Sequence, residues 1–159
     1  MNSVEIFDRH AIREFQFIVN DFGFERSDIP RTNSIGERRH LYESGRWFIA
    51  PYYDIYEKGI NVEFGNGKSV SNRLTVHMYM RLVDPAMYYQ LGFGIVHNDS
   101  EISLLLDLYV RALQSSGIGI LNRDDAVCRD LVYAMKFGKG MCPSYSEQPV
   151  DNRIDSRFV

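Results

Sequence analysis

The opening segment of the chain carries apolar residues at intervals of three and four. The residues on this apolar face are Val4, Phe7, Ala11, Phe15, Ile18 and Phe22. Since an α-helix repeats every ~3.6 residues, the spacing predicts a single amphipathic helix over residues 3–22. Ser3 is expected to cap its N-terminus, and Gly23 to end it in a left-handed conformation.

The middle of the chain changes to patterns typical of strands. Residues 46–56 are rich in β-branched and aromatic residues, and Pro51 among them predicts an edge position, a bulge or a break in that strand. Apolar and polar residues alternate over residues 60–64 and again, most clearly, over residues 74–82. A period of two predicts strands with one buried face.

The two alternating runs are joined by Gly65-Asn66-Gly67-Lys68-Ser69, which ends like a phosphate-binding loop. That loop requires a glycine five positions before Gly67, where this chain has Val62, and a helix after the serine, where the pattern predicts a strand. Asn66 and Gly67 both tolerate positive φ angles. We therefore predict a β-hairpin turn here and no nucleotide site.

Helical spacing returns in the last third of the chain. Asp84-Pro85 combines a capping residue with a proline at the first helical position, which predicts a short helix ending near Gly92. The apolar pattern then predicts a long, buried helix over residues 101–115 and a last helix over residues 123–137.

This order of elements predicts an α+β fold. Strands joined by short turns form an antiparallel β-meander, here of roughly three to five strands, with the N-terminal helix and the C-terminal helices packed on its apolar face. We assign residues 1–138 to a single α+β domain. Residues 139–159, which are rich in proline, serine and charge, are expected to form a poorly ordered C-terminal tail.

Composition narrows the function classes. The chain has 159 residues, 45% of them hydrophobic, and a net charge of −3. It can bury a core without a metal or a disulfide, and the acidic balance argues against a nucleic-acid partner. No apolar run predicts a signal peptide or a membrane span. Cys128 and Cys142 form no CxxC pair, so we expect free thiols and a cytoplasmic protein.

Local motifs for catalysis are also missing from the sequence. The four histidines stand at no metal-ligand spacing, and Gly-x-Ser-x-Gly is absent, so we expect no metal, no cofactor and no catalytic residue of a known local motif. Two alternatives stay open. One is a small enzyme whose site assembles in space, for example a hydrolase using His77 and Asp54. The other is a ligand-binding or regulatory module.

Two candidate surfaces for a protein partner can be named. Between Arg81 and Arg111 all charged residues are acidic, and Asp99, Glu101 and Asp107 among them are candidates for capturing a basic partner. The structural alternative is that the first two simply complement the dipole of a helix.

The second candidate surface is the polar face of the predicted sheet. Tyrosine and charge on a rigid sheet are typical of protein interfaces, although an ordinary solvated face has similar residues. The candidate contact residues are Tyr52, Asp54, His77 and Tyr79.

The layout resembles small bacterial immunity proteins of polymorphic-toxin and contact-dependent growth inhibition systems. The resemblance covers about residues 1–135 and rests on size, acidity, the opening helix that ends in Asp21-Phe22-Gly23-Phe24, and the meander that follows. It implies a non-enzymatic protein that binds a cognate toxin domain, here a basic one such as a nuclease, and blocks its active site or substrate surface.

Overall fold

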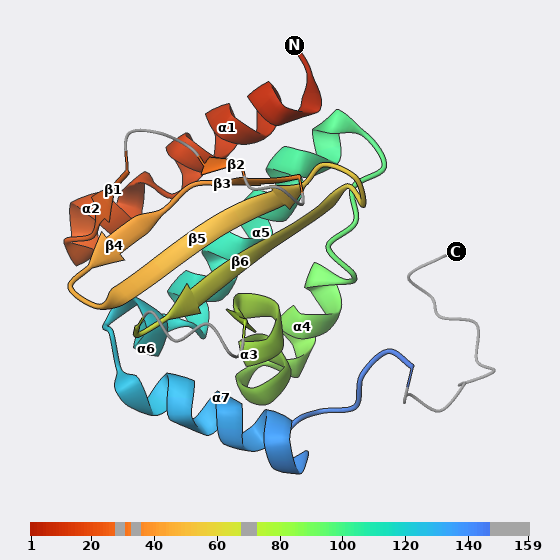
Figure 1. The fold of residues 1–159 in the computed structure, drawn as a ribbon. Helices are drawn as coiled ribbons and strands as arrows, with labels where there is room; N and C mark the ends of the chain where they lie inside the picture. The colour runs from red at the N-terminus through yellow and green to blue at the C-terminus, as the bar shows by residue number, and fades with distance from the viewer. Residues whose placement is uncertain (28–30, 33–35, 68–72, 147–159) are drawn as a thin grey trace.

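The computed structural model describes residues 1–27, 31–32, 36–67 and 73–146. It confirms the α+β class: helices pack on one face of an antiparallel sheet (Figure 1). In chain order the elements are α1 (Ser3–Glu14), α2 (Gln16–Phe22), β1 (Glu25–Arg26), β2 (Arg31–Thr32), β3 (Glu37–Arg39), β4 (Tyr42–Ser44), β5 (Trp47–Asp54), β6 (Gly59–Gly65), β7 (Leu74–Thr75), α3 (Val76–Val83), α4 (Pro85–Leu91), α5 (Asp99–Ser115), α6 (Ile118–Leu121) and α7 (Asp125–Phe137).

The opening helix is interrupted, so the prediction of one helix over residues 3–22 is wrong in that respect. Phe15, with φ −92° and ψ 4°, separates α1 from α2. Its side chain stays fully buried with those of Phe7 and Ile18, and for this reason the apolar spacing gave no sign of the break. Asn2, not Ser3, caps α1, whereas Gly23 ends α2 with φ 73° as predicted.

The sheet is built around β5, which pairs with β6 on one edge and with β3 and β4 on the other. The pairs Glu37↔Asp54 and Ser44↔Trp47 belong to one continuous register, so β3 and β4 lie end to end along β5. Pro51 has no N–H to donate, and this explains why the ladder is interrupted between them. β5 itself is continuous and central and keeps one register with β6, so the predicted edge position, bulge or break is not found.

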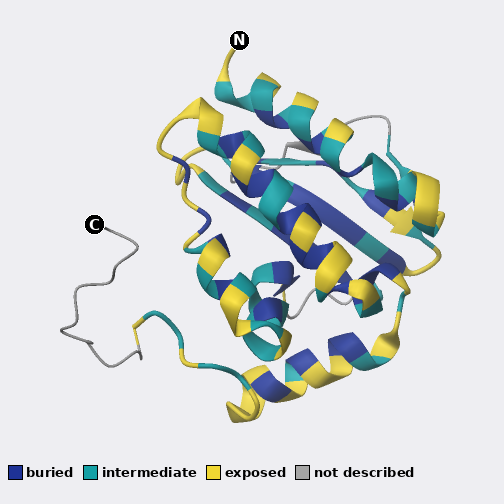
Figure 2. Cartoon of the chain, turned by 180° about the vertical axis from the view of Figure 1, so that it is seen from behind, coloured by how far each residue is buried: buried dark blue, intermediate teal, exposed yellow. Residues whose placement is uncertain are grey.

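One face of the sheet, which we call the inner face, is covered by α1 and α5 (Figures 1 and 2). Apolar side chains of β5 and β6 point into the layer between sheet and helices, and the pair Ile49↔Phe64 is fully buried there. The dark blue band along the sheet in Figure 2 marks this core. The opposite face, which we call the outer face, carries the alternate residues of the same strands.

The strand predicted over residues 74–82 is wrong. Only Leu74 and Thr75 pair with β6, and Thr75 then caps α3 by accepting the N–H of Met78 on its hydroxyl (3.2 Å). Val76 and Met80 are fully buried. A run with an apolar residue at every second position also places apolar residues at i and i+4, so the same sequence fits one face of a helix.

The turn predicted at Asn66-Gly67 is not a tight one. β6 and β7 are antiparallel, but the register Phe64↔Leu74 leaves a longer connection between them. Residues 68–72 of that connection lie outside the described residues.

The helices of the last third match the predicted ones, with the short α6 as an addition. Residues 139–146, which the sequence assigns to the tail, run along α3 and α4. The N–H of Cys142 donates to the carbonyl of Arg81 (3.1 Å), and the hydroxyl of Tyr145 donates to the carbonyl of Tyr88 (2.7 Å). Residues 147–159 lie outside the described part. Among the described helices, none combines the length and the apolar character needed to cross a membrane.

Candidate functional site

The outer face carries a cluster of charged residues around one tyrosine. We call it the outer-face cluster, and its members are Glu37, Arg39, Tyr52, Glu63 and Arg73. The strands β3, β5 and β6 supply the first four, because the register places Arg39 opposite Tyr52 and alternate residues of these strands share a face. Arg73 immediately precedes β7 in the chain.

Each glutamate of the outer-face cluster contacts both arginines. Arg39 Nη2 lies 3.1 Å from Glu37 Oε2 and 2.9 Å from Glu63 Oε2. Arg73 Nη1 lies 2.8 Å from Glu37 Oε1, and its Nη2 lies 3.0 Å from Glu63 Oε2. Both guanidinium groups also lie over the Tyr52 ring, at 5.3 Å for Arg39 and 4.9 Å for Arg73. The tyrosine is thereby held in one place by two cation–π contacts.

Burial differs strongly within this cluster. Glu37 and Glu63 are only 3% and 4% exposed, whereas the side chain of Arg73 is 40% exposed. Burial opposes the charge of Arg73, but its hydrogen bonds to the two glutamates outweigh burial and raise its pKa. Burial also raises the pKa of Tyr52, so its hydroxyl stays protonated at neutral pH. The outer-face cluster is a charge-balanced array whose arginine and tyrosine reach the solvent.

A second group of charges lies on the inner face. Arg38 donates from Nε (2.9 Å) and Nη2 (2.7 Å) to the carboxylate of Asp8 in α1, and His40 Nε2 lies 2.7 Å from the same carboxylate. We call these three residues the inner-face cluster. Although burial raises the pKa of Asp8, the hydrogen bonds from Arg38 and His40 outweigh it and lower the pKa overall.

His40 is fully buried, and burial lowers its pKa despite the neighbouring carboxylate. Its Nδ1 has no hydrogen-bond partner among the described residues. The ring packs against Phe7, with the centroids 5.7 Å apart. The inner-face cluster therefore ties α1 to the sheet; His40 is fully buried, while the side chains of Arg38 and Asp8 stay 25% and 20% exposed.

The structure separates the residues predicted for the sheet surface. Tyr52 and Asp54 do share the outer face, but His77 and Tyr79 lie on α3. Asp54 Oδ1 accepts the backbone N–H groups of Tyr56 and Glu57 (2.9 Å each), so this carboxylate shapes the turn between β5 and β6.

His77 belongs to an aromatic cluster with α4 and the segment after α7. Its ring stacks on Tyr88 at 4.6 Å and faces Tyr145 at 6.2 Å, and burial lowers its pKa to about 4. Its Nε2 lies 3.5 Å from the Tyr145 hydroxyl, and its ring also hydrogen-bonds the backbone of Gly92, so its partners do not include Asp54. The proposed hydrolase pair of His77 and Asp54 is therefore not assembled.

The three acids predicted for capture of a basic partner are engaged locally. Asp99 accepts the hydroxyl of Ser3 (2.8 Å), and Glu101 accepts the backbone N–H of His97 (2.7 Å) at the start of α5. Asp107 pairs with Arg111 one turn further along α5 (2.7 Å). These contacts favour the role of stabilising the helix start for the first two acids.

Sequence reasoning missed most of the outer-face cluster. Glu37 and Arg39 lie between the predicted first helix and the first predicted strand, in a segment for which no element was predicted. Once this segment pairs with β5, its residues alternate between the two faces of the sheet. No local sequence pattern pointed to Arg73, because its partners Glu37 and Glu63 are distant in the sequence.

Within the described ranges no three histidines, cysteines or acids are grouped to hold a metal ion. Both cysteines are free thiols, and burial raises the pKa of Cys128 to about 11, which keeps it protonated and unreactive at neutral pH. No family model, curated protein or solved structure matches the chain.

Proposed function

We propose that this chain is a non-enzymatic inhibitor of the immunity-protein type, which binds a cognate bacterial toxin domain through its outer face and occludes that domain. The observation that carries the proposal is the Tyr52 ring, which both Arg39 and Arg73 contact on a rigid sheet. Tyrosine and arginine are enriched among the residues that dominate protein-binding energy. A side chain already fixed in place loses little entropy on binding.

The charge distribution supports a basic partner. The chain carries a net charge of −3, so its long-range field attracts a positively charged domain. The outer-face cluster itself is balanced, with two glutamates against two arginines. Net charge would therefore set the association rate, and the cluster would set the lifetime of the complex.

The test is binding to toxin-like domains encoded beside this chain. We expect one of them to form a stoichiometric complex, and Tyr52→Ala to weaken it by about thirtyfold, which corresponds to roughly 2 kcal/mol. Tyr133→Ala is the matched control, since Tyr133 is an exposed tyrosine on α7 and its removal should leave the affinity unchanged. Equal losses of affinity in the two variants, or no loss of affinity for Tyr52→Ala, would contradict a contact through the outer face.

A second readout separates inhibition from mere binding. Cells that express the toxin domain should survive when they also express this chain, and protection should decline with Tyr52→Ala. Catalytic removal of the toxin's substrate or product by the purified chain alone would favour the enzyme alternative instead.

A further inference from the structure

The pair Asn66-Gly67 directly follows β6, and Asn66 is the only asparagine of the chain that a glycine follows. Neither residue has a positive φ angle, so the pair does not form the tight turn that its sequence favours. A Cβ at residue 67 would also meet no atom within 4 Å. Neither backbone conformation nor close packing therefore requires a glycine at this position.

Asn66 links the end of β6 to the start of α7. Its side-chain Nδ2 donates to Oδ1 of Asp125 (2.8 Å), an oxygen that also accepts Nε1 of Trp47 (3.2 Å). The backbone N–H of Asn66 hydrogen-bonds the thiol of Cys128, one turn further along α7. We call the two contacts of Asn66 with Asp125 and Cys128 the β6–α7 link.

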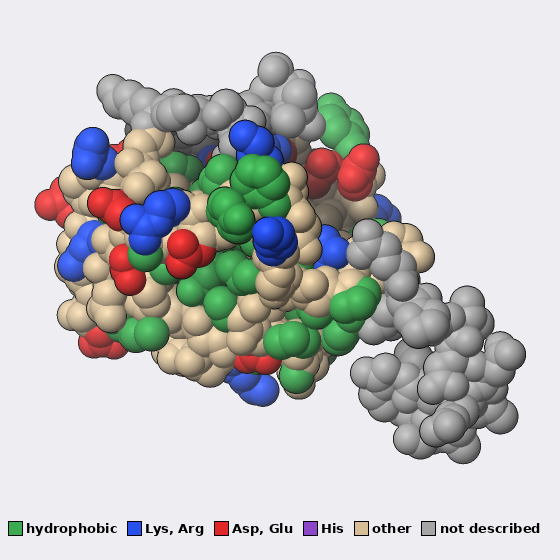
Figure 3. Space-filling model, turned by 90° about the horizontal axis from the view of Figure 1, so that it is seen from below, with side chains coloured by type: hydrophobic (Ala, Val, Ile, Leu, Met, Phe, Trp, Pro, Cys, Tyr) green, Lys and Arg blue, Asp and Glu red, His purple; other side chains and the backbone are tan. Residues whose placement is uncertain are grey.

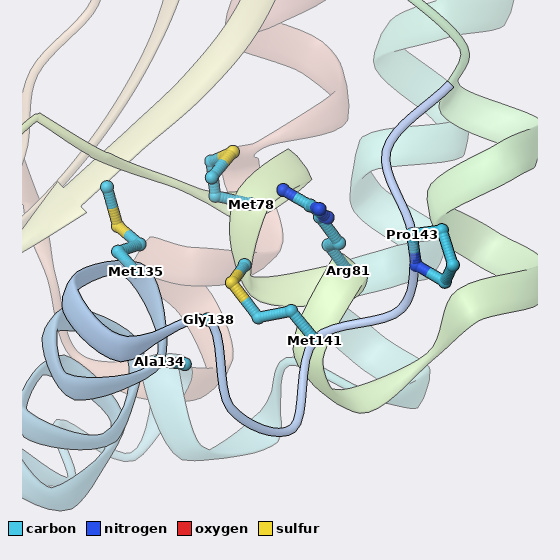
Figure 4. Close-up of a pocket in the computed structure, with 7 residues that line it drawn as sticks. All are labelled: Met78, Arg81, Ala134, Met135, Gly138, Met141 and Pro143. Atoms are coloured by element: carbon cyan, nitrogen blue, oxygen red, sulfur yellow. The ribbon is translucent and has the colours of Figure 1, made fainter. Parts of the chain in front are cut away.

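α7 lies along the lower side of the molecule, where acidic and basic side chains are mixed with hydrophobic ones (Figures 1 and 3). Toward its C-terminus a groove separates it from α3, and Met78, Met135 and Met141 are among the residues that line this groove (Figure 4). The described hydrogen bonds that join α7 to β5 and to the end of β6 all involve its first turn. The β6–α7 link therefore bears on how firmly α7 is attached.

The backbone nitrogen of Gly67 is free to react. No group of the described residues accepts its N–H, and both Asn66 and Gly67 are partly exposed to water. A glycine also has no side chain to shield this nitrogen. Asn61 of β6 differs in both respects, because its Oδ1 accepts the N–H of Val62 (2.8 Å) and the branched side chain of Val62 shields that nitrogen.

We propose that Asn66 is a site of spontaneous deamidation and that this reaction releases the end of β6 from α7. The backbone nitrogen of Gly67 attacks Cγ of Asn66 and closes a succinimide ring. The bond between Cγ and Nδ2 breaks, and the proton that Gly67 loses leaves with this nitrogen as ammonia. Water then opens the ring at either carbonyl, which gives aspartate or isoaspartate.

Neither product can form the β6–α7 link as asparagine does. The carboxylate at residue 66 has no N–H to donate, and it faces the carboxylate of Asp125. Hydrogen bonds from Asn66 and Trp47 lower the pKa of Asp125, so it is charged at neutral pH and the two carboxylates repel each other. Arg46 and Arg129 lower the same pKa from further away, and neither forms an ion pair with Asp125 among the described residues.

A time course on the full wild-type chain tests the reaction. The chain is incubated at mildly alkaline pH, since base removes the proton of Gly67, and samples are digested with trypsin and analysed by mass spectrometry. Cleavage after Lys58 and Lys68 gives one peptide that contains both Asn61 and Asn66. A sample digested at the start corrects for conversion during digestion.

We expect residue 66 to become aspartate and isoaspartate through a succinimide, while Asn61 stays an amide. Fragment masses distinguish the two positions within the same peptide. Equal conversion at both positions, or no conversion at residue 66, would overturn the proposal.

Gly67→Ala should slow the reaction while the fold is kept, because a Cβ has room there and the φ angle is not positive. The added methyl group hinders the attacking nitrogen. Conversion should be at least about tenfold slower, which corresponds to roughly 1.4 kcal/mol in the activation barrier. Gly59→Ala, at another glycine with room for a Cβ, should leave the rate as it is. Equal rates in the two variants would rule out Gly67 as the attacking residue.

Asn66→Asp reproduces one product and tests the release of α7. It should lower the midpoint of urea unfolding and speed the alkylation of the buried Cys128 relative to that of Cys142. Asn66→Asp combined with Asp125→Asn exchanges donor and acceptor, so it should restore both properties. An unchanged midpoint and an unchanged alkylation rate in Asn66→Asp, or no recovery in the double variant, would contradict the release. These results do not depend on the outer-face cluster, which shares no residue with the β6–α7 link.

Discussion

Four consecutive residues of the chain supply side chains to the inner-face cluster and to the outer-face cluster, two to each. Glu37, Arg38, Arg39 and His40 follow one another, and strand geometry sends them alternately to the two faces of the sheet. On the inner face, Arg38 and His40 meet Asp8 under α1. On the outer face, Glu37 and Arg39 meet two side chains from β6 and the start of β7.

What each cluster can do depends on the layer that covers it. The inner-face cluster lies between the sheet and α1, so its ion pairs join two parts of the fold, and only parts of Arg38 and Asp8 reach the solvent. The outer-face cluster has its carboxylates buried but presents arginine and tyrosine to solvent. The comparison predicts that inner-face changes alter stability alone, whereas outer-face changes alter binding more than stability.

Asp8→Asn should have the largest effect on stability. It leaves Arg38 and the buried His40 without their charged partner, at a cost of about 3 kcal/mol in the free energy of unfolding. Urea unfolding measures this as a lower midpoint with an unchanged slope. Asp21→Asn, at an exposed acid, is the matched control. A change below about 1 kcal/mol for Asp8→Asn would show that the inner-face cluster does not anchor α1.

Acidification should destabilise the fold by a smaller amount. Burial lowers the pKa of His77 to about 4 and lowers that of His40, so the unfolded chain takes up these protons at a higher pH than the folded one. The free energy of unfolding should therefore fall by about 1–2 kcal/mol between pH 7 and pH 4.5. The outer-face cluster contains no histidine.

The pH effect is checked by chemical unfolding at a series of pH values. His77→Phe keeps an aromatic ring in the stack with Tyr88 and should flatten the curve. His97→Gln, at an exposed histidine, should leave the curve as it is. A wild-type curve that is flat from pH 7 to pH 4.5 would contradict the lowered pKa values.

Arg73→Lys tests the outer-face cluster. A lysine keeps the charge but cannot contact Glu37 and Glu63 in the same fork or stack on Tyr52 in the same way. Because the Arg73 side chain is 40% exposed, the loss of stability should be only about 1 kcal/mol. Affinity for the toxin domain should fall by about tenfold. Arg129→Lys, at an exposed surface pair, is the control. Equal losses of affinity in the two variants would contradict a role of the outer-face cluster in binding.

Asp107→Asn provides the baseline outside both clusters. The pair of Asp107 with Arg111 is exposed on α5, so its removal should change stability by less than about 0.5 kcal/mol. Stopped-flow association with the toxin domain should show only the small decrease in on-rate that follows from the loss of one negative charge. A clearly slower on-rate would restore the acidic stretch of α5 as a capture surface.

Local patterns predicted the features that depend on neighbours in the sequence. The long α5 and α7, the C-terminal cap at Gly23 and the helix start at Asp84-Pro85 all follow from periodicity and capping. Residues 74–82 could not be predicted in this way, because alternating apolar residues fit a strand face and a helix face equally well. Packing of Val76 and Met80 in the core resolved that ambiguity.

The sequence by itself determined the α+β class, several helix ends and the acidic balance, since these depend on composition and on side chains a few positions apart. Only the tertiary structure decided which charges meet. Arg73 reaches Glu37 because the pairing of β6 with β7 and of β3 with β5 brings distant segments together. The groove lined by Met78, Met135 and Met141 likewise exists only where α3, α7 and the segment after α7 pack together. Such contacts depend on register and packing, which no local pattern encodes.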